Sequence, residues 1–231
     1  MDTGRDVLHS RVFDGLTEAD RRICLASATV VTARTGQWLA RQGDPATTFY
    51  LIATGALKLV QNTPEGQELI VRFVGSGDPF GGVVVLEHAT YPISALAVEA
   101  TTLHGWSAAG MQALVSRFPR LTTNIMREVA AHMTDALTRV REVTTQRVGR
   151  RLAMTLVRLA RQGGRPQADG ILLTHVLTRQ ELADLTGTTL YTVSRTLSKW
   201  QSDGILSSHA RRLIIRSPKR LSALADGSVD E

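Results

Sequence analysis

Residues 178–200 read TRQELADLTGTTLYTVSRTLSKW, and this stretch decides the fold of the C-terminal half. Thr178 followed three residues later by Glu181 predicts a capping box, in which each side chain bonds the backbone amide of the other residue. Gly187 ends this first helix. A second helix over residues 190–202 places apolar side chains inward at helical spacing, namely Val193, Leu197 and Trp200. Two helices joined by a short glycine turn predict a helix-turn-helix, whose second helix enters the major groove of DNA.

The residues after this stretch predict a hairpin. Two short apolar runs, 205–206 and 213–215, flank the polar residues 207–212. Ser217-Pro218 then begins a short terminal helix, because proline is favourable at the first helical position. The C-terminal part therefore reads as a winged helix-turn-helix.

Positive charge is concentrated in the same half of the chain. Residues 1–118 hold 9 basic and 11 acidic residues, whereas residues 119–231 hold 18 basic and 10 acidic residues. A near-neutral half joined to a strongly basic half predicts one domain that meets a polyanion such as double-stranded DNA. A solvated basic surface is the alternative explanation of the charge alone.

The composition excludes several other classes of protein. With 43% hydrophobic and 21% charged residues, the 231-residue chain can bury a core, and no apolar run approaches the ~20 residues of a membrane helix. The N-terminus has early acidic residues and no apolar stretch, so we expect no secretory signal and a cytoplasmic protein. Cys24 is the one cysteine, which excludes an iron–sulfur cluster held by four cysteines of one chain. A nucleophile elbow, a P-loop and metal-ligand spacing are missing, so we expect no enzyme.

The N-terminal half alternates short β-prone segments with glycines. The predicted strands are 30–33, 38–41, 48–53, 56–61, 68–74, 93–97 and 102–106. The glycines between them suit turns that need a positive φ. Regularly spaced short strands predict an antiparallel barrel, roll or sandwich. Short helices are expected over 19–26 and 108–116.

A long helix is predicted from Pro119 to about residue 147, because this stretch has no glycine and no further proline. Its apolar residues repeat in heptads, as in a coiled coil: Met126, Val129, Met133, Ala136, Val140 and Val143. A second apolar stripe lies beside them: Leu121, Ile125 and Leu137. Two stripes favour a helix that packs on its own domain and on a second copy of the chain. A helix packed on its own domain alone is the alternative.

Two motifs of the N-terminal half resemble a known family. Residues 36–44, GQWLARQGD, and residues 49–59, FYLIATGALKL, are similar to the cyclic-nucleotide-binding β-roll. Together with the long helix and the helix-turn-helix at 178–200, nearly the whole chain resembles the Crp/Fnr (catabolite-activator-like) regulators. The resemblance implies an α+β fold with a β-roll sensor domain over 1–118, a dimerisation helix over 119–148 and a winged helix-turn-helix domain over 149–231.

The resemblance also implies a function. It predicts a homodimeric transcription regulator, of a family that includes activators, bound to a pseudo-palindromic operator, with RNA polymerase as a further partner. A signal in the β-roll would alter the pairing of the long helices and move the DNA-binding domains about a hinge near Gly149.

The outward face of the second helix is expected to contact DNA. Arg195 corresponds to the family's arginine and would bond a guanine, while Ser194 is similar to the Fnr branch. Tyr191 stands where the family has glutamate, so we expect the half-site to differ from those of relatives at one base next to a shared guanine. Arg179, Arg211 and Arg212 are expected to hold phosphates. The predicted contacts are Arg179, Thr189, Leu190, Tyr191, Thr192, Ser194, Arg195, Lys199 and Arg211.

The residues that bind cyclic AMP in the family are missing. Phe-Gly-Gly at 80–82 stands in place of a Gly-Glu turn, and Ile-Ser-Ala at 93–95 stands in place of Arg-Ser-Ala. A buried phosphodiester without an arginine is strongly disfavoured, so we expect no binding of cyclic AMP. The expected effector pocket is lined by Phe80, Gly81, Gly82, Val83, Ile93, Ser94, Ala95, Ala136 and Leu137.

Several alternatives stay open from the residues alone. The pocket is filled by its own side chains and the regulator is constitutive, or it holds an apolar molecule such as an aromatic compound or haem. His88 and His132 are the candidate haem ligands, although none of the six histidines shows metal-ligand spacing. A non-specific architectural DNA-binding protein would share the basic half. A sequence-specific regulator should bind its own site about 10³-fold or more tightly than other DNA, and an architectural protein should not.

Overall fold

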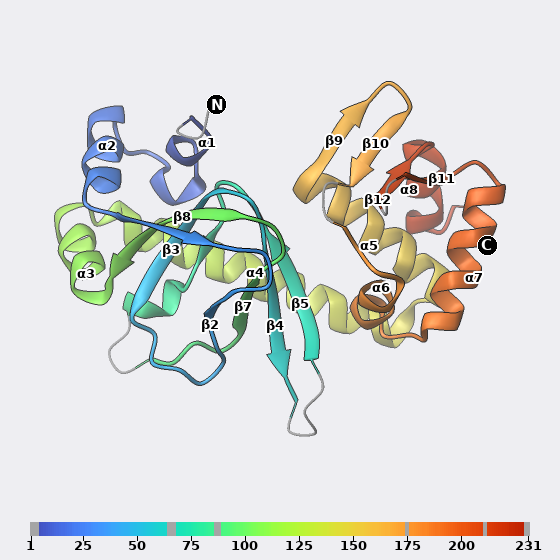
Figure 1. The fold of residues 1–231 in the computed structure, drawn as a ribbon, viewed down its shortest axis with the longest axis horizontal. Coiled ribbons are helices and arrows are strands. Elements are labelled where there is room, and N and C mark those ends of the chain that lie inside the picture. Colours follow the sequence, from blue (N-terminus) through green and yellow to red (C-terminus); the bar gives the residue numbers. More distant parts are fainter. Residues whose placement is uncertain (1–4, 64–67, 86–88, 174–175, 210–211, 229–231) are drawn as a thin grey trace. The chain divides into compact units, whose positions relative to one another are not determined.

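Figure 1 shows the computed structural model of the chain, which describes residues 5–63, 68–85, 89–173, 176–209 and 212–228. The fold divides into two compact units, Met1–Asp135 and Ala136–Glu231. Across the described ranges, every helix is too short or too polar to cross a membrane.

The first unit is built on two four-stranded sheets with antiparallel pairing. One sheet has the strand order β1-β8-β3-β6 and the other has the order β2-β7-β4-β5. The strands are β1 (Thr29–Ala33), β2 (Trp38–Ala40), β3 (Thr48–Thr54), β4 (Leu57–Asn62), β5 (Glu68–Val74), β6 (Pro79–Phe80), β7 (Ser94–Ala97) and β8 (Thr101–Ser107). Strands distant in sequence are neighbours, as in β1 with β8 and β2 with β7, which gives the β-roll that the sequence predicts.

The core of this unit has two parts because successive side chains of a strand point to opposite faces. On β3, Leu51 belongs to a cluster with Phe49 and Trp106, whereas the next residue, Ile52, belongs to a second cluster with Leu57 and Leu103. Short helices contribute to the first cluster: α1 (Arg5–Leu8), the 3-10 helix η1 (Arg11–Phe13), α2 (Glu18–Ala26) and α3 (Ala108–Arg117). The indole N–H of Trp106 donates to the carbonyl of Cys24 at 2.9 Å, which ties β8 to α2.

The long helix α4 runs from Arg120 to Thr145, directly after Pro119. Leu121 and Ile125 are buried in the first cluster. Between them, the buried amide of Asn124 donates to the carbonyls of Val12 and Asp14, both at 2.9 Å. Leu137 lies on the predicted second stripe but is 61% exposed, so only the first two residues of that stripe are buried.

The second unit is a helical domain with one small sheet. Its helices are α5 (Val148–Gly163), α6 (Arg179–Thr186), α7 (Leu190–Ser202) and α8 (Pro218–Asp226). The sheet has the order β11-β12-β10-β9, formed by β9 (Gly164–Gln167), β10 (Gly170–Leu173), β11 (Leu206–His209) and β12 (Arg212–Ile215). The β11–β12 pair is the predicted wing. The sequence analysis did not identify α5 or the β9–β10 hairpin.

Candidate nucleic-acid interface and effector cavity

Local capping chemistry positions the two helices of the helix-turn-helix. The hydroxyl of Thr178 accepts from the amide of Glu181 at 3.1 Å, and the Glu181 carboxylate accepts from the amide of Thr178 at 2.9 Å, so the predicted capping box is formed. Gly187 ends α6 in the left-handed region at φ 60°, where a side chain would be strained. Thr189 then caps α7 by accepting from the amide of Thr192 at 3.2 Å.

A buried arginine holds the turn between these helices. Arg151 of α5 is 9% exposed and donates to the carbonyls of Thr186 at 2.9 Å and Gly187 at 3.1 Å. A third bond, of 2.7 Å, reaches the carbonyl of Gln146, directly after α4. A guanidinium offers five donors in a fixed plane, which suits three carbonyls. The sequence analysis missed Arg151, because its role depends on a turn 35 residues further along the chain.

One face of α7 is buried and the opposite face is exposed. Val193, Leu197 and Trp200 are at most 2% exposed and anchor the helix in its domain. Of the predicted contact residues, Thr192 and Ser194 are half-buried, and the others on or beside this helix are exposed: Thr189, Leu190, Tyr191, Arg195 and Lys199. Tyr191 is the most open, at 74%. α7 therefore presents a polar, basic surface.

Two further predicted contacts lie outside α7. Arg179 is exposed at the first residue of α6. Arg211 lies outside the described residues, and the neighbouring Arg212 is exposed at the start of β12. Within the part of the chain that the structure describes, neither Arg179 nor Arg195 forms an ion pair, so both guanidinium groups are available to an anionic partner.

The predicted heptad positions of α4 are exposed in the single chain. The large apolar ones are Met126 at 53%, Val129 at 43%, Met133 at 65%, Val140 at 63% and Val143 at 48% exposed, and Ala136 is exposed as well. We call these six residues the α4 seam. An exposed apolar row at heptad spacing is typical of helices that pair in coiled coils.

The end of α4 is fixed to α5 by a buried ion pair. Both guanidinium nitrogens of Arg158 donate to the two carboxylate oxygens of Glu142, at 3.2 and 3.1 Å. The side chains are 21% and 7% exposed, respectively. A bidentate pair of this kind fixes orientation as well as distance.

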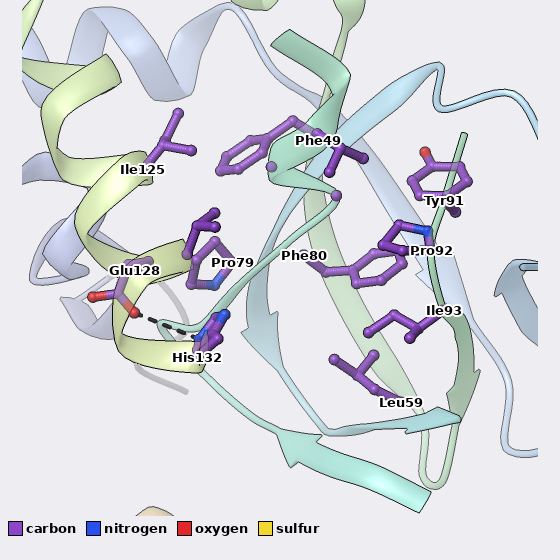
Figure 2. A pocket seen from close by; sticks show the side chains of 14 residues that line it. Phe49, Leu59, Pro79, Phe80, Tyr91, Pro92, Ile93, Ile125, Glu128 and His132 are labelled. Carbon is purple, nitrogen blue, oxygen red and sulfur yellow. Dashed lines mark ion pairs between the residues drawn. The ribbon is translucent and has the colours of Figure 1, made fainter. Parts of the chain in front are cut away.

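A cavity of about 200 Å³ lies between the strands of the β-roll and one side of α4. Figure 2 shows Ile125, Glu128 and His132 on α4 facing a wall that includes Phe80 and Ile93. The lining is completed by Phe49, Leu59, Pro79, Gly81, Gly82, Val83, Tyr91, Pro92 and Val129. The rings of Phe80 and Tyr91 stack with centroids 5.5 Å apart.

The cavity brings together five of the nine predicted pocket residues: Phe80, Gly81, Gly82, Val83 and Ile93. Ser94 and Ala95 are buried in β7 but do not line it, and the Ser94 hydroxyl instead accepts from the amide of Gln42 at 2.9 Å. Ala136 and Leu137 belong to the second unit and are exposed. The helix residues that do line the cavity are Ile125, Glu128, Val129 and His132. Of these, the sequence analysis associates only His132 with the pocket, as a candidate haem ligand.

Among the described lining residues, the ionisable side chains are those of Glu128, His132 and Tyr91. Nε2 of His132 lies 3.9 Å from Oε2 of Glu128, and Oε1 of Glu128 lies 3.9 Å from the guanidinium of Arg11. Burial lowers the pKa of His132 to about 4, and the nearby charge of Arg72 adds to this effect, so the ring is neutral at pH 7. The described lining contains no arginine or lysine that could pair with a cyclic phosphate.

The haem hypothesis stays a prediction. It pairs His132 with His88, and His88 lies outside the described residues. Among the described residues, no three His, Cys, Asp or Glu side chains lie close enough together to hold a metal ion.

Comparison with known proteins gives consistent matches to both halves. A Crp-like helix-turn-helix domain matches residues 150–224, and a cyclic nucleotide-binding domain matches residues 30–118. The cyclic AMP receptor protein of Thermus thermophilus is 28% identical over 154 residues, which are 67% of this chain and 71% of that protein. The transcriptional activator protein Anr of Pseudomonas aeruginosa is 29% identical over 125 residues, 54% of this chain and 51% of its own.

Solved structures extend the similarity to most of the chain. The structure of FixK2 from Bradyrhizobium japonicum has a TM-score of 0.74 at 25% identity and covers 85% of this chain and 96% of that one. These matches point to transcription regulators and not to enzymes.

Proposed function

The chain belongs to the Crp/Fnr family of DNA-binding transcription regulators, and from that premise we propose that it reads a pseudo-palindromic operator as a homodimer. The observation that carries the proposal is the exposed face of α7, where Arg195, Tyr191 and Lys199 stand free of the domain core. A helix in the major groove presents its exposed side chains to base edges. Two such helices, related by a two-fold axis, would occupy successive major grooves about 34 Å apart.

Arg195 is the residue proposed to read sequence. An arginine forms two parallel bonds with guanine O6 and N7, and one such pair discriminates against a wrong base by about 1–3 kcal/mol. Arg195 is exposed and makes no ion pair in the described part of the chain, so nothing has to be broken before it meets DNA. Arg179, exposed at the start of α6, is proposed to hold a phosphate, which sets position and not sequence.

The α4 seam supports the homodimer. Its large apolar side chains are 43–65% exposed in the single chain, and pairing with the same row of a second copy would remove them from water. A closed dimer also supplies the two-fold symmetry that a pseudo-palindrome requires. RNA polymerase is the further partner that we propose for the DNA-bound dimer.

Control of the regulator is proposed to act through the β-roll cavity and not through cyclic AMP. One relative is named a cyclic AMP receptor protein, but the described lining of this cavity holds no cation for a phosphate and carries the carboxylate of Glu128 instead. The alternative is a constitutive regulator whose β-roll needs no ligand. A ligand-binding experiment distinguishes this alternative from control through the cavity.

The test of the DNA-binding proposal is a specificity titration. An operator is first selected from random duplexes, and its affinity is compared with that of a scrambled duplex at physiological salt. The wild-type chain should prefer its operator by about 10³-fold or more. Arg195→Ala should lower operator affinity by about 5- to 150-fold per half-site and relax the preference at one base, with little effect on the scrambled duplex.

Arg34→Ala is the matched control, because Arg34 is an exposed arginine of the first unit and its loss changes the net charge equally. It should leave the preference intact. A wild-type chain that binds both duplexes equally would instead be an architectural DNA-binding protein, and the proposal would be wrong.

A further inference from the structure

We propose that the β-roll cavity binds a small neutral ring compound that carries one hydrogen-bond donor, of the kind represented by phenol and indole. The inference rests on the proposed function, since it names the ligand class that would control the regulator. It follows from the size of the cavity, its walls, and the carboxylate of Glu128 at its edge.

The size of the cavity sets the size of the ligand. An apolar cavity of about 150 Å³ takes up benzene, whereas sites for drug-sized molecules and cofactors occupy about 300–1,000 Å³. At about 200 Å³, this cavity lies between the two. It therefore suits one substituted ring or a compact fused pair of rings, and it is small for a nucleotide.

The walls favour a flat apolar body. Phe80 and Tyr91 stack on each other, with an angle of 14° between their ring planes. Figure 2 shows Leu59 and Ile93 beside them, facing Pro79 and Ile125 across the cavity. Apolar contact with aromatic walls is worth most to a ring that lies flat or edge-on against them. An ion would lose its hydration here without gaining a partner of opposite charge on these walls.

The polar edge of the cavity selects a donor. The Glu128 side chain is 12% exposed, and its two ion-pair partners among the described residues, Arg11 and His132, both lie 3.9 Å away, beyond hydrogen-bonding distance. Its nearest cation, Arg11, is 3.9 Å away and 79% exposed, so solvent weakens that pair. A carboxylate only accepts hydrogen bonds. A ligand hydroxyl or N–H would satisfy it, whereas a ligand carboxylate or phosphate has no proton to donate and would bring a second negative charge beside it.

The charges around the edge favour a neutral ligand over a cation. The Arg72 guanidinium is close enough to disfavour a proton on His132. It would disfavour a ligand cation at the same place, as would Arg11 beside Glu128. A neutral donor meets the carboxylate without either repulsion. The uncharged ring of His132, one helical turn from Glu128, can then exchange a further hydrogen bond with a hydroxyl.

Val129 connects this cavity to the α4 seam. It lines the cavity, yet it is 43% exposed and belongs to the heptad row proposed to pair with a second copy. A bound ring would press on a side chain that also takes part in pairing. Ligand binding would therefore bias the helix pairing, and with it the affinity for the operator.

The test measures ligand binding to the full chain by calorimetry, with phenol, indole, toluene, benzoate and cyclic AMP as probes. Phenol and indole should each bind once per chain and should change the operator affinity, toluene should bind at least 5-fold more weakly, and benzoate and cyclic AMP should not bind. Ile93→Trp, which fills the cavity, should abolish binding of phenol and indole.

Two variants that remove the charge of Glu128 test whether the hydrogen-bond donor of the ligand binds to this carboxylate. Glu128→Leu should weaken the binding of phenol by about 10-fold or more, since hydrogen bonds to charged groups are worth about 1.5–3 kcal/mol. It should leave the binding of toluene unchanged. Glu128→Gln keeps the shape of the side chain in case the leucine variant does not fold, and it should weaken phenol to a smaller extent. Glu99→Gln, which removes an exposed carboxylate of the first unit outside the cavity, is the control and should change the binding of neither probe.

Preferred binding of benzoate or cyclic AMP, equal binding of toluene and phenol, or no binding of any ring compound would overturn the inference. The operator titration without ligand is run on the same samples. If specific DNA binding persists while no ring compound binds, the proposed ligand class is wrong and the proposed function as a DNA-binding regulator is still supported. If specific DNA binding is absent, the proposed function itself fails.

Discussion

Replacement of Arg158 by methionine should destabilise the second unit by about 3 kcal/mol. The Glu142 carboxylate is only 7% exposed and receives two hydrogen bonds from Arg158, at 3.2 and 3.1 Å. Methionine keeps much of the apolar stem but leaves this carboxylate buried without its partner. Breaking one side of a buried ion pair costs about 3–5 kcal/mol. Because Arg158 is itself 21% exposed, water reaches the vacated space, which places the expected loss at the lower end.

A double-mutant cycle separates the pair from its surroundings. Glu142→Leu removes the carboxylate and leaves an arginine that can turn toward solvent, so it should cost less, about 1–2 kcal/mol. The double variant replaces both charges with apolar groups and should lie within about 1 kcal/mol of the wild-type chain. The two substitutions should therefore be strongly non-additive, with a coupling of about 2 kcal/mol or more.

The assay must follow the second unit alone within the full chain. Hydrogen exchange at increasing urea concentration, measured on peptides from α5, reports the free energy of opening of that unit. Peptides from β3 and β8 in the first unit serve as the internal reference and should not change. A loss below about 1 kcal/mol in Arg158→Met, or a double variant that loses the sum of the two single effects, would refute the reasoning.

Two further predictions concern α4. Met133→Glu with Val140→Glu places two charges in the α4 seam and should convert the proposed dimer into a monomer in sedimentation equilibrium, with loss of the proposed operator binding. Ala131→Glu, on an exposed face of α4 outside the seam, is the control and should have neither effect. A double variant that is still dimeric would place the interface elsewhere. The pKa of His132, about 4 in the folded chain against an ordinary 6.5, predicts that the unfolded chain takes up a proton that the folded chain refuses between these pH values. The stability linked to His132 is thus complete above pH 6.5 and falls as the pH drops toward 4. His132→Asn should flatten that part of the profile of melting temperature against pH, and the exposed His9→Asn should not; an unchanged slope in His132→Asn would contradict the assignment.

The helix-turn-helix could be predicted because its signals are local. A capping box, a glycine at positive φ and three inward positions on α7 depend on residues a few places apart, and the structure has all of them. The β9–β10 hairpin lacks such signals. The strand Gly164–Gln167 contains a proline and has no alternation of apolar residues, so it forms only because β10 is beside it.

The helix side of the cavity could not be placed for a related reason. Heptad spacing shows which residues share a stripe of α4, but it does not show which turn of that helix faces the β-roll. Burial of the second stripe ends after Ile125, and Leu137, three turns further on, is exposed. The cavity residues on the strand side could be predicted more readily. Phe80 adjoins a glycine-rich turn and Ile93 adjoins a strand, and the spacing of short β-prone segments and glycines locates both.

The glycine at position 82 has a consequence for how this site can evolve. A Cβ atom there would meet Cγ2 of Ile125 at 3.3 Å, and Ile125 is a buried core residue of α4. Any side chain at position 82 would therefore require Ile125 to shift by a few tenths of an ångström. A substitution at this turn is thus coupled to the packing of α4, so this wall of the cavity changes most readily when the turn and the helix change together.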